Sequence, residues 1–245
     1  NLKLCVKMPV CPPVDNYRDV NSPLLNIPSF PMDLNLCSDC RNAQLSHVVD
    51  PSILYSNYIY DSSSSTDLNL HFRQYYKEIT KIKNYSSSMK ILDIGSNDGL
   101  FLDNFKNHKI KIGVDPANIK NRCKNVYVIK DYFCKEVCNK ILSKFDKINL
   151  ITANNVFSHV DNLEEFISNL RMILSDDGFF IFEVSYFPDL IKNKVLDYIY
   201  HEHLNYFSLK PLKTFFEKKK LFINYVQKVK TKGGSIRCFV SKKKY

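Results

Sequence analysis

Residues 89–105, MKILDIGSNDGLFLDNF, contain the pattern that decides the fold. A short apolar run reaches Asp93 and is followed by a turn that contains Gly95 and Gly99. Glycine lets the backbone approach a ligand closely, because a Cβ atom there would collide with it. Open parallel sheets bind ligands beyond the carboxyl ends of their strands. The stretch therefore predicts a strand, a ligand-binding turn and a helix.

Helix and strand patterns alternate along the chain on both sides of this stretch. One helix pattern starts at Thr66, a plausible N-cap, and ends near residues 84–88. A second contains Leu100, Leu102 and Phe105, and a third follows the capping pair Asp161 and Glu164. The strand patterns occupy residues 109–117, 125–133, 147–157 and, after Gly178, 179–185. Such alternation predicts an α/β fold with a doubly wound parallel sheet. Residues 221–230 and 235–242 flank a KGG turn and predict a closing antiparallel pair.

The turn itself indicates which cofactor the sheet binds. It reads D-x-G-S-N-D-G instead of the G-x-G-x-x-G that holds a pyrophosphate, and Asp93 and Asp98 would repel one. Two carboxylates suit the sulfonium and ammonium groups of S-adenosylmethionine. Asp115 lies 20 positions after Gly95, at the end of the second strand, where it can accept hydrogen bonds from ribose hydroxyls. The alternative is a generic strand–turn–helix with acidic surface residues.

Length and composition limit the other possibilities. A chain of 245 residues that is 44% hydrophobic predicts one sizeable α/β domain with a smaller appendage. We place the appendage at residues 1–60, which are rich in proline and asparagine, and the main domain at 61–245. The sequence has no apolar run of about eighteen residues and no signal pattern, so we expect a cytoplasmic protein without membrane contact. The eight cysteines form no secreted-type disulfide framework.

The net charge of +10 raises the question of nucleic-acid binding. Many lysines lie in short runs, at 218–220 and 242–244, without interleaved aromatic residues. Runs of this kind are typical of solvated surfaces or tails, so we do not expect nucleic acid as the partner. A basic surface fits an anionic small substrate such as a nucleotide diphosphate equally well.

The stretch YHEH, residues 200–203, holds two of the six histidines. In an extended segment His201 and His203 would point the same way, so a metal pair is one interpretation. However, the stretch is not the helical H-E-x-x-H zinc pattern, and no third ligand lies nearby in sequence. The other interpretations are two structural histidines or a catalytic base, and we favour the base.

Seven blocks of the sequence resemble, in the same order, the SAM-dependent sugar C-methyltransferase family. The resemblance covers about residues 24–240. It implies a Rossmann-like class I SAM methyltransferase fold, with a mostly parallel seven-stranded sheet, helices on both faces and a small irregular N-terminal module. This family methylates nucleotide-linked 4-keto deoxysugars, commonly at C3. The blocks are YIYDSSSS (58–65), LDIGSNDG (92–99), GVDPA (113–117), NNVFSHVDNLEEF (154–166), EVSYFPDL (183–190), YIYHEHLNYFSL (198–209) and GGSIR (233–237).

The resemblance also implies residue roles. A proton next to a ketone is weakly acidic, so a base must remove it while donors hold the enolate oxygen. His203 would be this base, close to Tyr200 and Glu202, with His159 and Tyr60 completing the pocket. The expected cofactor residues are Asp93, Gly95, Asn97, Asp98, Gly99, Asp115, Pro116, Phe133 and Asn154, and the expected substrate residues are Asn155, His201 and Arg237.

Two departures from the family affect what we expect. Its zinc module uses two C-x2-C pairs, and here Cys37 and Cys40 match only the second. Either the chain begins late, or Cys5 and Cys11 act as ligands, or zinc is lost, and on balance we do not expect zinc here. Family members also continue after GGSIR with another domain, so this chain is expected to be part of a longer polypeptide or to need a partner. The alternative functions are a SAM-binding domain in a larger, possibly nucleic-acid-associated assembly, and an O- or N-methyltransferase.

Overall fold

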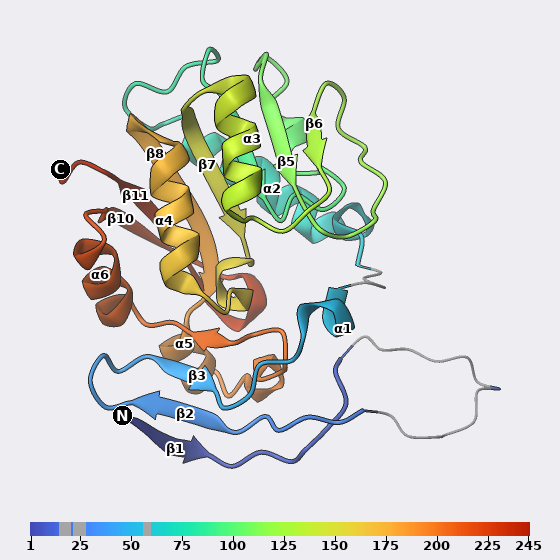
Figure 1. The fold of residues 1–245 in the computed structure, drawn as a ribbon, viewed down its shortest axis with the longest axis vertical. Helices are drawn as coiled ribbons and strands as arrows, with labels where there is room; N and C mark the ends of the chain where they lie inside the picture. The colour runs from blue at the N-terminus through green and yellow to red at the C-terminus, as the bar shows by residue number, and fades with distance from the viewer. Residues whose placement is uncertain (15–20, 22–27, 56–59) are drawn as a thin grey trace.

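A computed structural model describes residues 1–14, 21, 28–55 and 60–245. Its centre is a seven-stranded sheet in the order β10-β11-β8-β7-β4-β5-β6 (Figure 1). The five strands from β8 to β6 pair in parallel, and β11 and β10 close the sheet antiparallel, as predicted. The strands are β4 (Ile91–Ile94), β5 (Lys111–Val114), β6 (Tyr127–Ile129), β7 (Ile148–Asn154), β8 (Leu174–Ser185), β10 (Phe222–Val229) and β11 (Ser235–Ser241).

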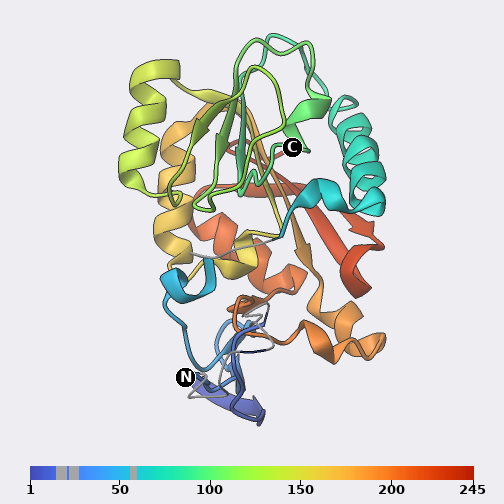
Figure 2. The same cartoon turned by 90° about the vertical axis from the view of Figure 1, so that its right-hand side faces the viewer.

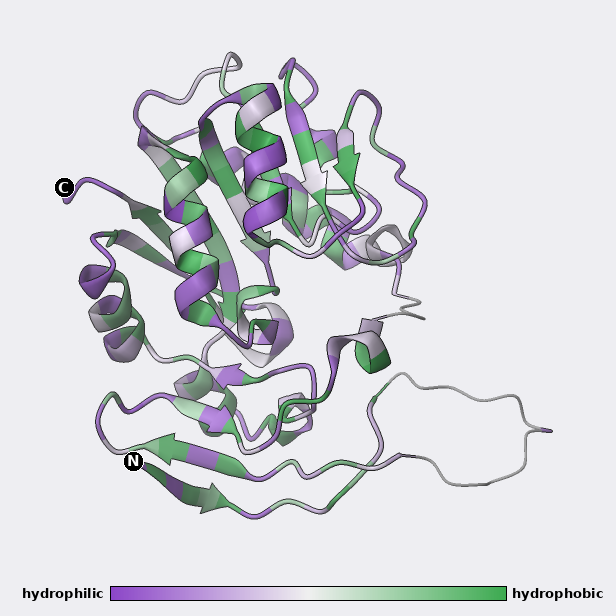
Figure 3. Cartoon of the chain, viewed as in Figure 1, coloured by the Kyte–Doolittle hydropathy of each residue, from purple (hydrophilic) through white to green (hydrophobic). Residues whose placement is uncertain are grey.

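Helices cover both faces of this sheet, which confirms the predicted fold class. Figure 2 shows α2 (Thr66–Ile79) on one side and α3 (Lys135–Phe145) with α4 (Leu163–Ile173) on the other. Each face has its own buried apolar cluster, and hydrophobic colouring is concentrated in the central strands (Figure 3). Removing this apolar surface from water is the main stabilisation of the fold. Helices α5 (Phe187–Lys192) and α6 (Leu209–Lys218) follow β8.

The N-terminal segment forms a second, smaller sheet beneath the end to which β7 points (Figure 1). Its order is β1-β2-β3-β9, with β1 (Leu2–Val6), β2 (Leu34–Cys37), β3 (Ala43–Leu45) and β9 (Asn205–Tyr206). One apolar cluster joins side chains of this segment to Ile199, Leu204 and Tyr206. Pairing with β9 therefore places the N-terminal segment against the chain that follows YHEH. The domain division at residue 60 stays a prediction.

Single-turn elements connect these pieces. The short helix α1 (Pro51–Tyr55) precedes the main domain, and 3-10 turns lie at η1 (Ser62–Ser64), η2 (Leu102–Asn104), η3 (Phe157–His159), η4 (Leu196–Tyr198) and η5 (Thr231–Gly233). Within the ranges that the structure describes, no helix is both long enough and apolar enough for a bilayer span.

The helix caps differ from the prediction by one residue. Ser65, not Thr66, is the N-cap of α2, and its hydroxyl accepts a hydrogen bond from the Leu68 N–H at 3.2 Å. At α4 the capping residue is Asn162, whose side chain accepts from the Glu165 N–H at 3.1 Å. A capping oxygen must reach the N–H three residues on, and only these registers let it do so.

The helix predicted around Leu102 is wrong. The segment forms only the 3-10 turn η2, because Asn104 donates through its side chain to the carbonyls of Leu100 and Phe101 at 3.2 and 3.1 Å. Such side-chain bonds compete with the regular helical ladder. The segment still fills the core, since Phe101 and Phe105 are fully buried. Two other boundaries also move: α2 ends at Ile79, and β8 begins before Gly178.

Candidate active site

A cavity of about 420 Å³ opens at the carboxyl ends of β4, β5 and β7. The chain runs from β4 to β5 and β6 on one side and later returns to β7 and β8 on the other, so the strand order reverses beside β4. This reversal is where doubly wound sheets bind ligands, and the volume is typical of small-molecule sites. The wall contains residues of the β4 turn, of the loops after β5, β6 and β7, and Tyr200, Glu202 and Leu204.

Gly95 is required by the packing of a loop that lies far from it in the sequence. Its φ of +70° is a left-handed conformation, and a Cβ atom there would lie 2.2 Å from Cγ2 of Val156, in the loop after β7. Gly99, at φ +83°, would bring a Cβ atom to 2.5 Å from Oδ1 of Asn121. Both glycines are therefore needed to pass neighbouring loops. Gly95 lines the cavity, but Gly99 is not among the lining residues.

Asp93 is the most buried carboxyl group of the cavity, with 2% of its surface exposed. Its Oδ1 accepts hydrogen bonds from the Thr152 hydroxyl at 2.6 Å and from Nδ2 of Asn154 at 3.4 Å. Burial raises the pKa of Asp93 to about 8, against the hydrogen bond of Thr152, and the charge of Asp115 adds to the rise. An electrostatically unsatisfied carboxyl of this kind favours a cationic ligand.

Asp115 also lines the cavity, at the end of β5 as predicted. Its two oxygens accept from the backbone N–H groups of Asn97 and Ala117, each at 2.8 Å. Burial raises the pKa of Asp115, while these two hydrogen bonds oppose the rise. The bond from Asn97 connects the β4 turn to the β5 loop, so the two predicted cofactor loops form one surface.

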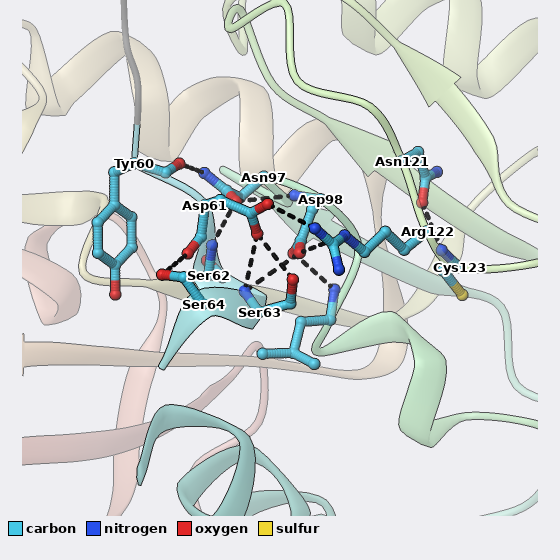
Figure 4. A network of polar contacts seen from close by, with 11 residues as sticks. Tyr60, Asp61, Ser62, Ser63, Ser64, Asn97, Asp98, Asn121, Arg122 and Cys123 are labelled. Carbon is cyan, nitrogen blue, oxygen red and sulfur yellow. Dashed lines mark hydrogen bonds and ion pairs between the residues drawn. The ribbon is translucent and has the colours of Figure 1, made fainter. Parts of the chain in front are cut away.

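The prediction that Asp98 faces the cofactor is wrong. Asp98 is fully buried and does not line the cavity. Its carboxylate accepts from the N–H groups of Ser63 at 3.2 Å and Leu100 at 3.1 Å, and Nε of Arg122 lies 3.7 Å away (Figure 4). Of the two carboxyls of the β4 turn, only Asp93 lines the cavity, together with Asp115 from the end of β5. Asp98 instead stabilises the segment before α2 through its hydrogen bond with Ser63.

Asn97 positions the expected residue Tyr60. Its Oδ1 accepts from the Ser62 N–H at 2.9 Å, and its Nδ2 donates to the Tyr60 carbonyl at 2.9 Å (Figure 4). Asn97 has a left-handed φ of +50°, which turns its side chain toward this segment. Tyr60 and Asn97 both line the cavity. The Ser-rich stretch after Tyr60 is thus a support for the site.

The loop after β6 contributes more than the sequence indicated. Phe133 and Pro116 line the cavity as expected. Asp131 and Tyr132 also line it, and both were missed. The signal was available, because these residues follow the third strand and so reach the same edge of the sheet as Asp115.

His203 reaches the cavity only through Tyr200. It is 3% exposed and is not a lining residue, whereas Tyr200 is. Nδ1 of His203 lies 3.0 Å from the Tyr198 carbonyl, which can only accept, so Nδ1 carries the proton. Nε2 then accepts from the Tyr200 hydroxyl at 2.9 Å. Burial, helped by the charge of Lys232, lowers the pKa of His203 to about 4, so the ring is neutral at pH 7.

His159 stands beside His203, with their ring centroids 5.1 Å apart. Its Nδ1 lies 3.2 Å from the Tyr55 hydroxyl, and its Nε2 is buried without a hydrogen-bond partner in the described ranges. Burial, then His203 and Lys232, lower the pKa of His159 well below its usual value. His159 also lines the cavity, so a neutral imidazole forms part of its wall.

Two amides follow β7 at the same wall. Asn154 and Asn155 both line the cavity, as predicted. Oδ1 of Asn154 is buried and has no hydrogen-bond partner among the described residues, so it can accept from a ligand. Asn155 has a left-handed φ of +57°, and its N–H donates to the Glu183 carbonyl at 2.9 Å. Strained backbone of this kind is common at functional sites.

Glu202 and Lys232 bring opposite charges to the cavity. Glu202 was expected there, and it is 6% exposed. Lys232, from η5, was missed. Burial lowers the pKa of the Lys232 ammonium, and the charges of Glu202 and Glu183 oppose this. The sequence signal was weak, since Lys232 is one of many lysines and lies 30 positions beyond Glu202.

Two expected substrate residues lie elsewhere. His201 is fully buried beneath the N-terminal segment, with Nε2 3.2 Å from the Phe30 carbonyl. Arg237 is 2% exposed, and Nε donates to Oε1 of Glu183 at 2.6 Å. Its guanidinium also stacks 3.6 Å from the Tyr75 ring centroid. Neither lines the cavity, because β11 pairs with β8 in a register that sets Arg237 opposite Glu183.

Cys37 and Cys40 enclose a tight turn between β2 and β3 and are free thiols. In the part of the chain that the structure describes, no group of three or more His, Cys, Asp or Glu side chains is arranged to hold a metal. Two thiolates do not close a structural zinc site, which needs four ligands. Cys37 and Cys40 stay candidate ligands for a zinc ion that we do not expect on balance, and no part of the chemistry below uses it.

Comparisons with known proteins show the family of the chain. Residues 69–221 match the model of a methyltransferase domain family. The C-methyltransferase NovU of Streptomyces niveus is 31% identical over 216 residues, which cover 86% of this chain and 51% of that protein. The chain thus spans about half the length of this relative.

Solved structures of low sequence identity share the fold. A SAM-dependent methyltransferase from Anabaena variabilis has a TM-score of 0.54 at 14% identity, over 71% of this chain and 86% of that one. Magnesium protoporphyrin IX methyltransferase from Synechocystis, solved with bound SAH, has a TM-score of 0.50 at 9% identity, over 72% and 82%. The chain therefore belongs to the methyltransferase domain family, and its fold is that of the class I methyltransferases that use S-adenosylmethionine.

Proposed function

We propose that this chain binds S-adenosylmethionine and methylates the carbon next to the ketone, C3 by family resemblance, of a nucleotide-linked 4-keto deoxysugar. One observation carries the proposal. The cavity that contains the buried carboxyls Asp93 and Asp115 also contains the hydroxyl of Tyr200, which is bonded to the neutral imidazole of His203. A cation site and a proton acceptor thus share one enclosed space.

The residues present fit the cofactor. Asp93, with its raised pKa, regains its charge beside a sulfonium or ammonium group, and the unpaired Oδ1 of Asn154 accepts from the ammonium. Asp115 would accept hydrogen bonds from the ribose hydroxyls, and Asp131 and Phe133 would form the wall on the β6 side of the cofactor. S-adenosylmethionine, when bound, supplies an electrophilic methyl group that is lost to a carbon nucleophile. The residues of the chain must supply the proton acceptor and position the sugar.

The proton acceptor is the Tyr200–His203 pair. The phenol oxygen of Tyr200 takes the proton from the sugar carbon while its own proton passes to Nε2 of His203. This transfer requires a neutral His203 with an open Nε2, and the Tyr198 carbonyl holds that tautomer by accepting from Nδ1. Glu202 adds a negative charge to the same wall, where it acts on Lys232. General base catalysis by a positioned pair typically contributes about 10²–10⁴-fold.

The relative NovU supports the choice of carbon as the acceptor atom, because it is named a C-methyltransferase. Three ionisable groups at one wall, Tyr200, His159 and Glu202, with His203 behind Tyr200, also suit the removal of an α-proton. An O- or N-methyltransferase needs no apparatus to remove a proton from carbon.

Mass spectrometry of the products tests the proposal. The chain, S-adenosylmethionine and a panel of nucleotide-linked 4-keto sugars should yield a sugar with one additional methyl group, bonded to carbon. Solvent deuterium should also exchange into that carbon position. A methyl group on oxygen or nitrogen would replace this function with the alternative one.

Variants separate the proton acceptor from general damage. His203→Asn and Tyr200→Phe should lose exchange and methyl transfer while they still bind S-adenosylmethionine. His108→Asn is the matched control, because His108 is a buried histidine outside the cavity, hydrogen-bonded to Tyr85 at 3.2 Å. Full exchange in His203→Asn would exclude this role for His203.

A further inference from the structure

Lys232 is a cation at the wall that holds the proton acceptor. It lines the same cavity as Tyr200, Glu202 and His159. Its charge acts on His203 and His159 strongly enough to contribute to their lowered pKa values. Yet it comes from η5, a turn on the far side of the sheet order from β4, between the closing strands β10 and β11.

The turn that carries Lys232 is held in one conformation. Lys232 has a left-handed φ of +53°, which is unfavourable for a residue with a side chain. The next residue, Gly233, accepts a hydrogen bond at its carbonyl from Nδ2 of Asn193 at 2.8 Å. The carbonyl of Gly234 accepts from the Tyr186 N–H at 2.9 Å. The surrounding chain thus stabilises a strained backbone that presents one lysine to the cavity.

Added side chains would displace this turn. A Cβ atom on Gly233 would lie 2.9 Å from both γ carbons of Val195, and one on Gly234 would lie 2.6 Å from Cβ of Asp189. The GG pair is therefore needed for the turn to pack against the segment before YHEH. The packing of this turn limits the positions that the Lys232 ammonium can occupy.

The Lys232 ammonium disfavours the protonation of His203 unless an anion forms beside the ammonium. In the ligand-free cavity Lys232 makes protonation of His203 harder, since like charges repel. An enolate oxygen beside Lys232 would cancel this repulsion at the moment when His203 receives the proton. Lys232 therefore disfavours the protonation of His203 only while no enolate is present.

We propose that the Lys232 ammonium binds the ketone oxygen of the sugar and stabilises the enolate that forms there. The proposal rests on the proposed function and adds the group that the negative charge needs. The C–H bond breaks, its proton passes to the Tyr200–His203 pair, and its electrons form the C=C bond. The carbonyl π electrons move to oxygen, which Lys232 holds. When the carbon gains the methyl group, the C=O bond re-forms and His203 later releases its proton to water.

The test measures enolisation apart from methyl transfer. Solvent deuterium exchange of the nucleotide-linked keto sugar is followed with S-adenosylhomocysteine bound, at saturating sugar. Lys232→Met should slow exchange about 100-fold, the usual effect of losing one oxyanion donor. Binding of S-adenosylhomocysteine should not change. Lys232→Arg, which keeps the positive charge, should recover part of the rate.

The neighbouring exposed lysine is the matched control. Lys230→Met removes the same charge two residues away, on a side chain outside the cavity, and should exchange like the wild type. Thermal unfolding of each variant checks that the turn still folds. Loss of exchange in Lys232→Met with an unchanged melting temperature supports the proposal.

Three results would overturn it. Exchange in Lys232→Met at the wild-type rate would remove Lys232 from the reaction. Weaker sugar binding with unchanged exchange at saturation would place Lys232 at the diphosphate instead. No recovery in Lys232→Arg would show that the lysine does not act as a cation. A wild-type chain that neither exchanges nor methylates any keto sugar would refute the proposed function itself, which is a different outcome.

Discussion

The carboxyl group of Asp93 should make cofactor binding dependent on pH. Burial raises its pKa to about 8, so the carboxyl is mostly protonated at pH 7 in the ligand-free chain. A cationic ligand stabilises the ionised form, and binding must therefore release a proton. Affinity for S-adenosylmethionine should increase as pH increases toward 8. In the ligand-free chain the sign is opposite: a raised carboxyl pKa contributes stability at low pH that is lost as pH rises through about 8.

The size of the effect follows from the pKa. At a pKa of about 8, roughly one molecule in 100 has ionised Asp93 at pH 6, and about one in four at pH 7.5. If only the ionised form binds, affinity should increase about 25-fold over this range, or about 1.9 kcal/mol. The range stops at about pH 7.5 because the α-amino group of the ligand itself titrates near pH 8.

Isothermal titration calorimetry measures both quantities. Titrations in two buffers of different ionisation enthalpy give the number of protons released, which should approach one at pH 6. Asp93→Asn should bind more weakly and release no proton. Asp131→Asn removes another carboxyl of the cavity and should change affinity by the same factor at every pH. A dissociation constant that is independent of pH, or proton release that persists in Asp93→Asn, would refute the assignment of this carboxyl to the cation.

Three further predictions concern stability and can be checked by urea unfolding. Gly95→Ala should lower the free energy of unfolding by about 2–3 kcal/mol, because alanine is strained at a left-handed φ and its Cβ atom would clash with Val156. The double variant Gly95→Ala, Val156→Ala removes the clash and should recover only the share of the free energy that the clash costs. Arg237→Met should cost about 3–5 kcal/mol, because it leaves the buried Glu183 carboxylate with His71 as its remaining charged or chargeable partner, whereas a substrate-binding arginine would mainly change substrate affinity. Ser65→Ala should cost about 1 kcal/mol as the loss of a helix cap, and Thr66→Ala should be nearly neutral; the reverse order would contradict the observed cap.

The cofactor side of the cavity was predictable from local sequence. Asp93, Gly95 and Asp115 each follow directly on a strand pattern, and the carboxyl ends of parallel strands meet at one edge. The order of the residues along the chain was therefore enough to bring them together. Asp98 shows the limit of this reasoning, because the direction of a side chain in a turn depends on the left-handed φ of Asn97.

The proton-transfer side depended on contacts that no periodic pattern in the sequence predicts. His203 was predicted as the base, but its connection to the cavity through Tyr200 follows from a fold in which Tyr198 and Tyr200 hold the imidazole from both sides. Arg237 was expected at the substrate and is buried instead, because the register of β11 sets it opposite Glu183.

The sequence alone thus determined the order of strands and helices, the parallel sheet and the acidic edge that suits a sulfonium cofactor. These depend on hydrophobic period and on turn residues, which are local properties. Only the tertiary structure decided which other charges share the cavity: it adds Lys232 and leaves Asp98 out. Burial and distance set the pKa of each group, and neither quantity exists until segments far apart in the chain pack together.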